Sequence, residues 1–66
     1  GIIIINEYQN NNYGSNALEL LISYSWDKLD LLSLYANINP KNNSSVSLFN
    51  KFYFKKIKDT LYKLDK

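Results

Sequence analysis

Neither cysteine nor histidine occurs among the 66 residues of the chain. A domain this short buries little of its surface, and small domains usually gain extra stability from disulfides, a bound metal or a partner chain. The first two need side chains that this sequence lacks, so no metal site is expected. The chain opens at Gly1 directly into an apolar run. We therefore expect residues 1–66 to be the C-terminal portion of one larger domain whose N-terminal part is missing, and to form a homo-oligomer with this run near its interface.

Charge and hydropathy narrow the class of protein. The formal net charge is +2, which is too small to indicate a nucleic acid partner. Residues 1–30 hold four acidic residues and one lysine, whereas residues 31–66 hold seven lysines and two acidic residues. The second part is therefore the one that suits an anion. The apolar run is much too short to cross a bilayer, so a soluble, cytoplasmic protein without a membrane partner is expected.

The first half of the chain predicts a strand, a loop and a helix. Residues 2–5 are four isoleucines, which predict a strand buried on both faces, because β-branched side chains suit a sheet and no polar residue interrupts them. The polar stretch 7–16 predicts an exposed loop. From Asn16 onward apolar residues recur at steps of three and four, which predicts a helix of about four turns, capped by Asn16 with Glu19 reaching back. The expected core positions of this helix are Ala17, Leu18, Leu21, Ile22, Ser25 and Leu29.

The second half predicts further strands around a short helix. The expected strands cover residues 31–39, 53–58 and 60–64. Pro40 ends the first of these, since proline is not tolerated inside a sheet. Asn42 or Asn43 can cap a helix that runs to about Phe52. The order strand, helix, strand, helix, strand favours parallel pairing, so the predicted fold class is α/β (α+β) with a mixed sheet.

The segment between the first strand and the first helix has the character of an anion site. A buried strand leads into a polar loop that contains Gly14, and the loop opens a helix. Free backbone amides and the positive end of the helix dipole converge there, which suits a phosphate. Many α/β folds share this arrangement without a ligand, and Gly14 can equally be a simple helix-entry residue. The residues by themselves leave both interpretations open.

Two segments resemble the signatures of the GNAT N-acetyltransferases. The stretch 7–18 (EYQNNNYGSNAL) resembles the family's pyrophosphate loop, Gln/Arg-x-x-Gly-x-Gly/Ala, followed by a helix with Ala-Leu near its start. The stretch 39–54 (NPKNNSSVSLFNKFYF) resembles the second signature, Asn-x-x-Ser/Ala-x-x-Leu-Tyr-x-Lys-x-Gly-Phe. The intervening residues 21–29 look like the helix of the branch that acetylates ribosomal-protein N-termini. The two motifs are in register, and the resemblance runs through nearly the whole chain.

This resemblance implies a partial GNAT fold with a site for acetyl-CoA as co-substrate. Ile4 and Ile5 would offer strand-edge amides to the pantetheine arm and the acetyl carbonyl, where the first two strands splay apart. Asn42 matches the family's asparagine beside the cofactor, although a simple helix cap explains it equally well. The pyrophosphate would be held, mainly through backbone N–H groups, by Gln9, Asn10, Asn11, Asn12, Tyr13, Gly14 and Ser15.

Three positions depart from the family's pattern. Asn12 replaces the first glycine of the loop, and asparagine is the non-glycine residue that best tolerates a positive φ. Phe49, also expected at the cofactor, replaces the tyrosine that protonates the departing thiolate, and a phenyl ring cannot donate a proton. Tyr53 replaces the later glycine, and its hydroxyl is an alternative donor. The catalytic residues are therefore unassigned, and the chain by itself is expected to be inactive.

The resemblance implies transfer of an acetyl group from acetyl-CoA to an amine in the complete protein. The acceptor is open: a protein N-terminus or a small amine such as a polyamine, an antibiotic or an amino sugar. Two other functions also remain open, a non-catalytic GNAT-like assembly module and a small RNA-binding module. The RNA-binding residues would be Tyr24, Trp26, Phe52, Lys51, Lys55, Lys56 and Lys58. These aromatic residues also fall on apolar stripes, which favours ordinary packing.

Overall fold

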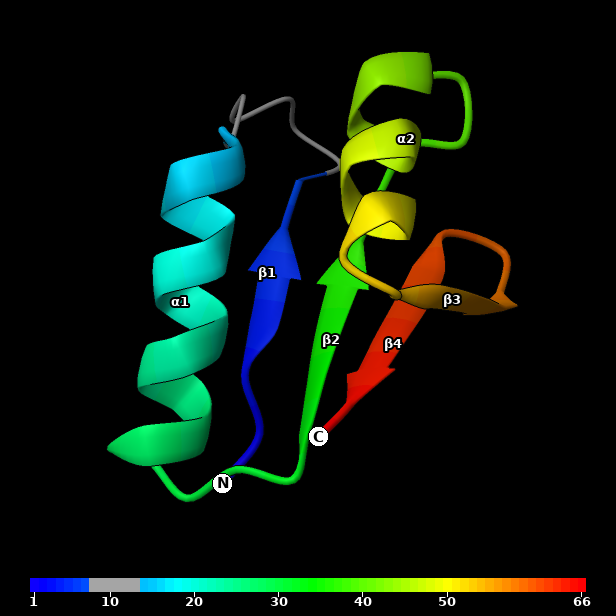
Figure 1. Ribbon diagram of the computed structural model, residues 1–66. Coiled ribbons are helices and arrows are strands. Elements are labelled where there is room, and N and C mark those ends of the chain that lie inside the picture. The colour runs from blue at the N-terminus through cyan, green and yellow to red at the C-terminus, as the bar shows by residue number, and fades with distance from the viewer. Residues whose placement is uncertain (8–13) are drawn as a thin grey trace.

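The described part of the chain is a mixed sheet packed against helices (Figure 1). The structure is a computed structural model, and it describes residues 1–7 and 14–66. These residues form β1 (Ile4–Asn6), α1 (Ser15–Asp27), β2 (Ser33–Asn37), α2 (Asn43–Lys51), β3 (Lys55–Lys58) and β4 (Leu61–Asp65). The predicted α+β class and the order β-α-β-α-β are therefore confirmed, with β4 as the further strand.

The strands lie in the order β1-β2-β4-β3. β1 pairs with β2 in parallel, and β4 pairs with both β2 and β3 in antiparallel fashion. Ile5 is the partner of Ala36 in β2, and Ala36 is the partner of Tyr62 in β4, so these three side chains form one row across the sheet. All three are buried in the core.

Both helices cover the same face of the sheet. The crossovers β1-α1-β2 and β2-α2-β3 advance across the sheet in the same direction, and right-handed crossovers that do so place their helices on one face. Leu18 of α1 and Phe49 of α2 accordingly share one core with the row of Ile5. The opposite face of the sheet, which we call the open face, has no helix from the described residues. It carries Ile4 and Tyr35, partners across β1 and β2.

The prediction that residues 2–5 are buried on both faces is wrong. Ile5 is buried, but Ile2 is 75 % exposed and Ile4 is 59 % exposed. The one-sided placement of the helices is the reason, because alternate side chains of β1 point to the open face. An uninterrupted apolar run therefore does not distinguish a strand covered on both faces from one covered on one face.

The start of α1 also differs from the prediction. Gly14, not Asn16, is the N-cap, and the N–H of Leu18 closes the first turn on the carbonyl of Gly14 at 3.0 Å. Asn16 lies inside the helix, so it is not available as a cap, and no capping box with Glu19 forms. Among the predicted core positions, Leu18 and Ser25 are buried and Leu21 and Ile22 are partly buried.

Two predicted core positions of this helical region are exposed. Ala17 directly precedes Leu18, and one residue turns a helix by about 100°, so its side chain points away from the core. Leu29 lies beyond the end of α1 and is 40 % exposed. Trp26 packs against the core instead. The buried hydroxyl of Ser25 donates to the carbonyl of Leu21 at 2.7 Å, which satisfies its hydrogen bond within the helix.

Asn42 caps α2, as predicted. Its side-chain oxygen accepts hydrogen bonds from the backbone N–H of Ser45 at 3.2 Å and from the hydroxyl of Ser44 at 3.0 Å. These bonds satisfy one of the backbone donors that a helix leaves unpaired at its start. The cap fixes the first turn of α2, which presents Phe49 to the core.

A Schellman motif ends α2. The N–H of Tyr53 donates to the carbonyl of Asn50 at 3.0 Å, and the N–H of Phe54 donates to the carbonyl of Phe49 at 3.0 Å. The rings of Phe49 and Phe54 meet edge to face, with centroids 5.0 Å apart. Tyr53 adopts φ 73°, in the left-handed region. For this reason β3 begins at Lys55 rather than at residue 53 as predicted.

Candidate functional site

The N-termini of both helices lie at one end of the sheet. Figure 1 shows α1 and α2 beginning at the end to which the arrows of β1 and β2 point. This follows from the parallel pairing, because each strand runs to the same edge and the next helix starts from there. Ligands of open α/β sheets bind outside the carboxyl ends of the strands. We therefore take this end of the sheet as the candidate site.

The start of α1 is suited to an anion. Its N-cap, Gly14, has no side chain with which to satisfy the first backbone N–H groups, and no acidic residue lies in the first turn. Residues 14–17 are all exposed. The first turn of a helix leaves its amides without helical partners and carries the positive end of the dipole. Residues 14–17 themselves contribute no charged side chain that neutralises this partial charge.

Gly14 is not required by the backbone conformation. It adopts φ −90° and ψ 166°, an extended conformation open to any residue. A Cβ atom built at this position meets no heavy atom within 4 Å. Gly14 thus enters the helix as its N-cap, and a side chain at this position has room.

The backbone of β1 is paired where a splay was expected. Ile4 and Ile5 are partners of Tyr35 and Ala36, so β1 and β2 do not separate at these two positions. The N–H of Tyr35 donates to the carbonyl of Ile3 at 3.1 Å. Since backbone groups of a parallel strand alternate between its two sides, those of Ile4 point to the outer edge of β1. The Ile4 amide is thus placed on a strand edge, as predicted, but on the side away from β2.

Ser15, also predicted to bind the pyrophosphate, is the exposed first residue of α1. The other predicted site residues divide into three groups. Asn42 lies at the candidate end of the sheet and acts as a cap, while its contact with a cofactor stays a prediction. Phe49 is fully buried and contacts Phe54, so no ligand reaches its ring in this structure. The third group lies outside the described residues and comprises Gln9, Asn10, Asn11, Asn12 and Tyr13.

Tyr53 is far from the candidate site. It follows α2 at the end opposite Asn42, and nine residues of helix rise about 13 Å. Its side chain is 78 % exposed. The hydroxyl of Tyr53 is therefore not placed to replace the proton donor that Phe49 lacks.

The aromatic residues considered for RNA binding do not form one surface. Trp26 and Phe52 pack against the core, whereas Tyr24 is exposed on α1. Stacking of successive bases needs exposed aromatic faces along one path. This arrangement favours the packing role of Trp26 and Phe52.

Glu7 was not singled out from the sequence, yet it is fully buried directly after β1. A carboxylate is almost never fully buried unless it is paired, and Glu7 does interact with another residue. A glutamate that immediately follows an apolar strand was the available signal. Its position puts a carboxyl group at the candidate end of the sheet.

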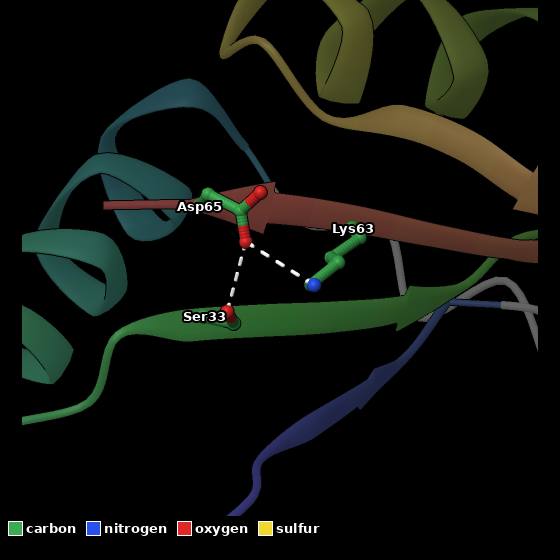
Figure 2. A network of polar contacts seen from close by, with 3 residues as sticks. All are labelled: Ser33, Lys63 and Asp65. Atoms are coloured by element: carbon green, nitrogen blue, oxygen red, sulfur yellow. Dashed lines mark hydrogen bonds and ion pairs between the residues drawn. The ribbon is translucent and has the colours of Figure 1, made fainter.

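A polar network that sequence analysis also missed lies on the open face (Figure 2). The hydroxyl of Ser33 donates to Oδ1 of Asp65 at 2.9 Å, and Nζ of Lys63 lies 3.4 Å from the same oxygen. Nζ of Lys63 is also 5.6 Å from the ring centroid of Tyr35. The hydrogen bond from Ser33 and the charge of Lys63 lower the pKa of Asp65, and Asp65 in turn raises the pKa of Lys63.

The geometry first defines a class of protein. The chain is an α+β domain in which a parallel β-α-β unit presents, at the carboxyl ends of its strands, a helix N-terminus with no side-chain cap from the described residues. Comparison with protein families then identifies it. The family model described as an acetyltransferase (GNAT) domain matches residues 1–55, so the chain belongs to the GNAT acetyltransferase family. No curated protein and no solved structure gives a significant match.

Proposed function

We propose that this chain binds acetyl-CoA at the candidate end of the sheet and contributes to acetyl transfer onto an amine. The observation that carries the proposal is the exposed, uncapped N-terminus of α1, which lies where β1 and β2 end. A pyrophosphate carries the charge that this terminus attracts. The family supplies the reaction, since acetyl transfer is its general activity.

The proposed role of each residue follows from its place in the fold. Backbone N–H groups of residues 14–17 bind the pyrophosphate, and the edge of β1 at Ile4 pairs with the amide-containing arm of the cofactor. In the reaction, the amine nitrogen gives up a proton to a base and forms a bond to the acetyl carbon, the bond from that carbon to sulfur breaks, and the departing thiolate takes up a proton. Phe49 cannot supply this proton, because a buried phenyl ring has none to give. The donor therefore comes from elsewhere in the active site.

The proposal also names the chemical class of the amine that accepts the acetyl group. We propose a protein N-terminus, of the kind acetylated by the branch that residues 21–29 resemble, with a small amine as the other candidate. Comparison of turnover on an N-terminal peptide and on a polyamine distinguishes the two. No described residue is assigned as the base of this reaction.

Binding of the cofactor is tested by titrating acetyl-CoA into the ¹⁵N-labelled chain. We expect amide shifts at residues 4–7, at residues 14–17 and at Asn42. The informative variant is Gly14→Asp, because an N-cap aspartate stabilises a helix by about 0.5 kcal/mol but repels phosphate. We expect a higher unfolding midpoint together with an affinity for acetyl-CoA lower by on the order of tenfold.

The matched control is Ser47→Asp, which adds the same charge at an exposed position within α2. It should leave the affinity unchanged. Absence of any response at millimolar acetyl-CoA would contradict the proposal. So would shifts confined to the lysine-rich residues 55–66, or an equal loss of affinity in both variants.

A further inference from the structure

β3 is a strongly basic edge strand. It pairs only with β4 among the described residues, and all four of its residues are exposed. Three of the four are lysines, Lys55, Lys56 and Lys58, and none of them forms an ion pair with a described residue. Residues 51–66 hold six lysines and two aspartates, which gives +4, whereas residues 1–50 sum to −2. The positive charge of the chain is thus concentrated around this edge.

A hollow on the sheet adjoins the edge. Its volume is about 440 Å³, and it is lined by Tyr53, Lys55, Ile57, Lys63, Leu64 and Asp65. Tyr53 is 78 % exposed and Ile57 is 51 % exposed, so two large apolar side chains face solvent there. The hollow therefore combines an apolar wall with ammonium groups.

Two residues of this hollow, Lys63 and Tyr53, have distinctive settings in the sheet and at the end of α2. Lys63 is fixed by Asp65 and by the ring of Tyr35. Tyr53 occupies a left-handed conformation that disfavours every residue with a Cβ, yet its ring gains little from burial in the chain. Strained, exposed residues of this kind are typical of binding sites. An exposed aromatic ring at such a position favours contact with a ligand.

We propose that the β3 edge binds an acidic peptide in extended conformation, with an apolar side chain of that peptide seated in the hollow. An unpaired strand edge offers backbone N–H and C=O groups to an added strand. Lysines on an edge strand disfavour pairing with a neutral or basic strand, but they attract a strand that carries carboxylates. Lys55 lies in the row of Lys63 and Lys56 in the row of Tyr62, so the edge has a cation on each face. This proposal is independent of acetyl transfer.

The test is an NMR titration of the ¹⁵N-labelled 66-residue chain with the blocked peptide acetyl-Glu-Glu-Leu-Glu-Leu-Glu-amide, whose extended form carries both leucines on one face and carboxylates on both faces. We expect saturable amide shifts at residues 53–58 and 63–65. The double variant Lys55→Gln/Lys56→Gln should weaken binding by roughly 2- to 25-fold, since exposed ion pairs each contribute about 1.4- to 5-fold. The matched control is Lys28→Gln/Lys41→Gln, which removes the same charge from exposed lysines away from β3 and should leave binding unchanged.

Three comparisons can overturn the proposal. A peptide with serine in place of both leucines that binds equally well would show that the hollow is not used. An equal loss of affinity in the control variant would show that only net charge matters. Tighter binding of an oligouridylate of equal charge to the same residues would assign the surface to nucleic acid instead of an acidic peptide.

Discussion

Replacement of Tyr53 by glycine should stabilise the protein. Tyr53 follows α2 with φ 73°, where the Cβ of an L-residue approaches the backbone too closely. The two hydrogen bonds of the Schellman motif that hold this conformation use backbone atoms only, so any residue can make them. The family's pattern has glycine at this position. The substitution therefore removes strain without removing a hydrogen bond.

The size of this stabilisation is best measured as the difference in the free energy of unfolding between Tyr53→Gly and Tyr53→Ala, because both variants lose the exposed ring. Relief of the left-handed conformation is worth roughly 1–2 kcal/mol. The greater freedom of glycine in the unfolded chain opposes this by about 0.5–1 kcal/mol. We expect the glycine variant to be more stable than the alanine variant by roughly 0.5–1 kcal/mol.

Urea unfolding, followed by the fluorescence of Trp26, gives the comparison directly. With a slope of about 1 kcal/mol per molar urea, the two midpoints should differ by roughly 0.5–1 M. Ser47, which is exposed within α2, serves as the control position. There the Ser47→Gly variant should be less stable than the Ser47→Ala variant by about 1 kcal/mol, because glycine disfavours a helix. If the glycine variant is less stable than the alanine variant at both positions, the strain assigned to the left-handed conformation of Tyr53 is refuted.

Three further predictions concern a cap, the core and the polar network. Asn42→Ala should cost about 1 kcal/mol in thermal or urea unfolding, through loss of the α2 cap, and an unchanged midpoint would contradict that role. Phe49→Tyr should lower the unfolding free energy by about 1–3 kcal/mol, because its hydroxyl enters a buried apolar core; a neutral result would mean that the hydroxyl reaches a partner or solvent. Because the pKa of Asp65 is lowered in the folded state, its contribution to the free energy of unfolding is complete above pH 3.8 and is lost as the pH falls through the folded pKa. Because the pKa of Lys63 is raised in the folded state, its contribution to the free energy of unfolding is complete below pH 10.5 and is lost as the pH rises through the folded pKa. Ser33→Ala should bring the Asp65 pKa closer to 3.8, measured by carboxyl ¹³C NMR, and an unchanged pKa would show that this hydrogen bond does not set it.

Local patterns predicted the elements well, because each depends on neighbours in sequence. The strand predicted over residues 31–39 contains β2, and Asn42, one of the two predicted caps, precedes the first residue of α2. The exposure of Ile4 was not predictable in this way, because it depends on which face both crossovers cover. That property belongs to the topology and not to any single segment.

The candidate site was only partly predictable for the same reason. The strand, loop and helix order predicted a helix N-terminus after β1, but with Asn16 as its cap, whereas the structure has Gly14 as the N-cap and no side-chain cap there. Burial of Glu7 and of Phe49 arises from contacts across the fold, which a motif does not encode. The Ser33 and Asp65 hydrogen bond joins residues 32 positions apart, and only the β2-β4 register brings them together.

The strand order has a consequence for how the protein folds and opens. β4 lies between β2 and β3, although β3 precedes it in the chain. The β3-β4 hairpin closes through a short local turn at Asp59 and Thr60, whereas docking of β4 on β2 must close a long loop through α2 and β3. Formation of the hairpin should therefore be fast, and its docking on β2 should limit the folding rate. In hydrogen exchange, amides shared between β2 and β4 should open only with the whole sheet, while those of β1 and β3 should exchange through smaller local openings.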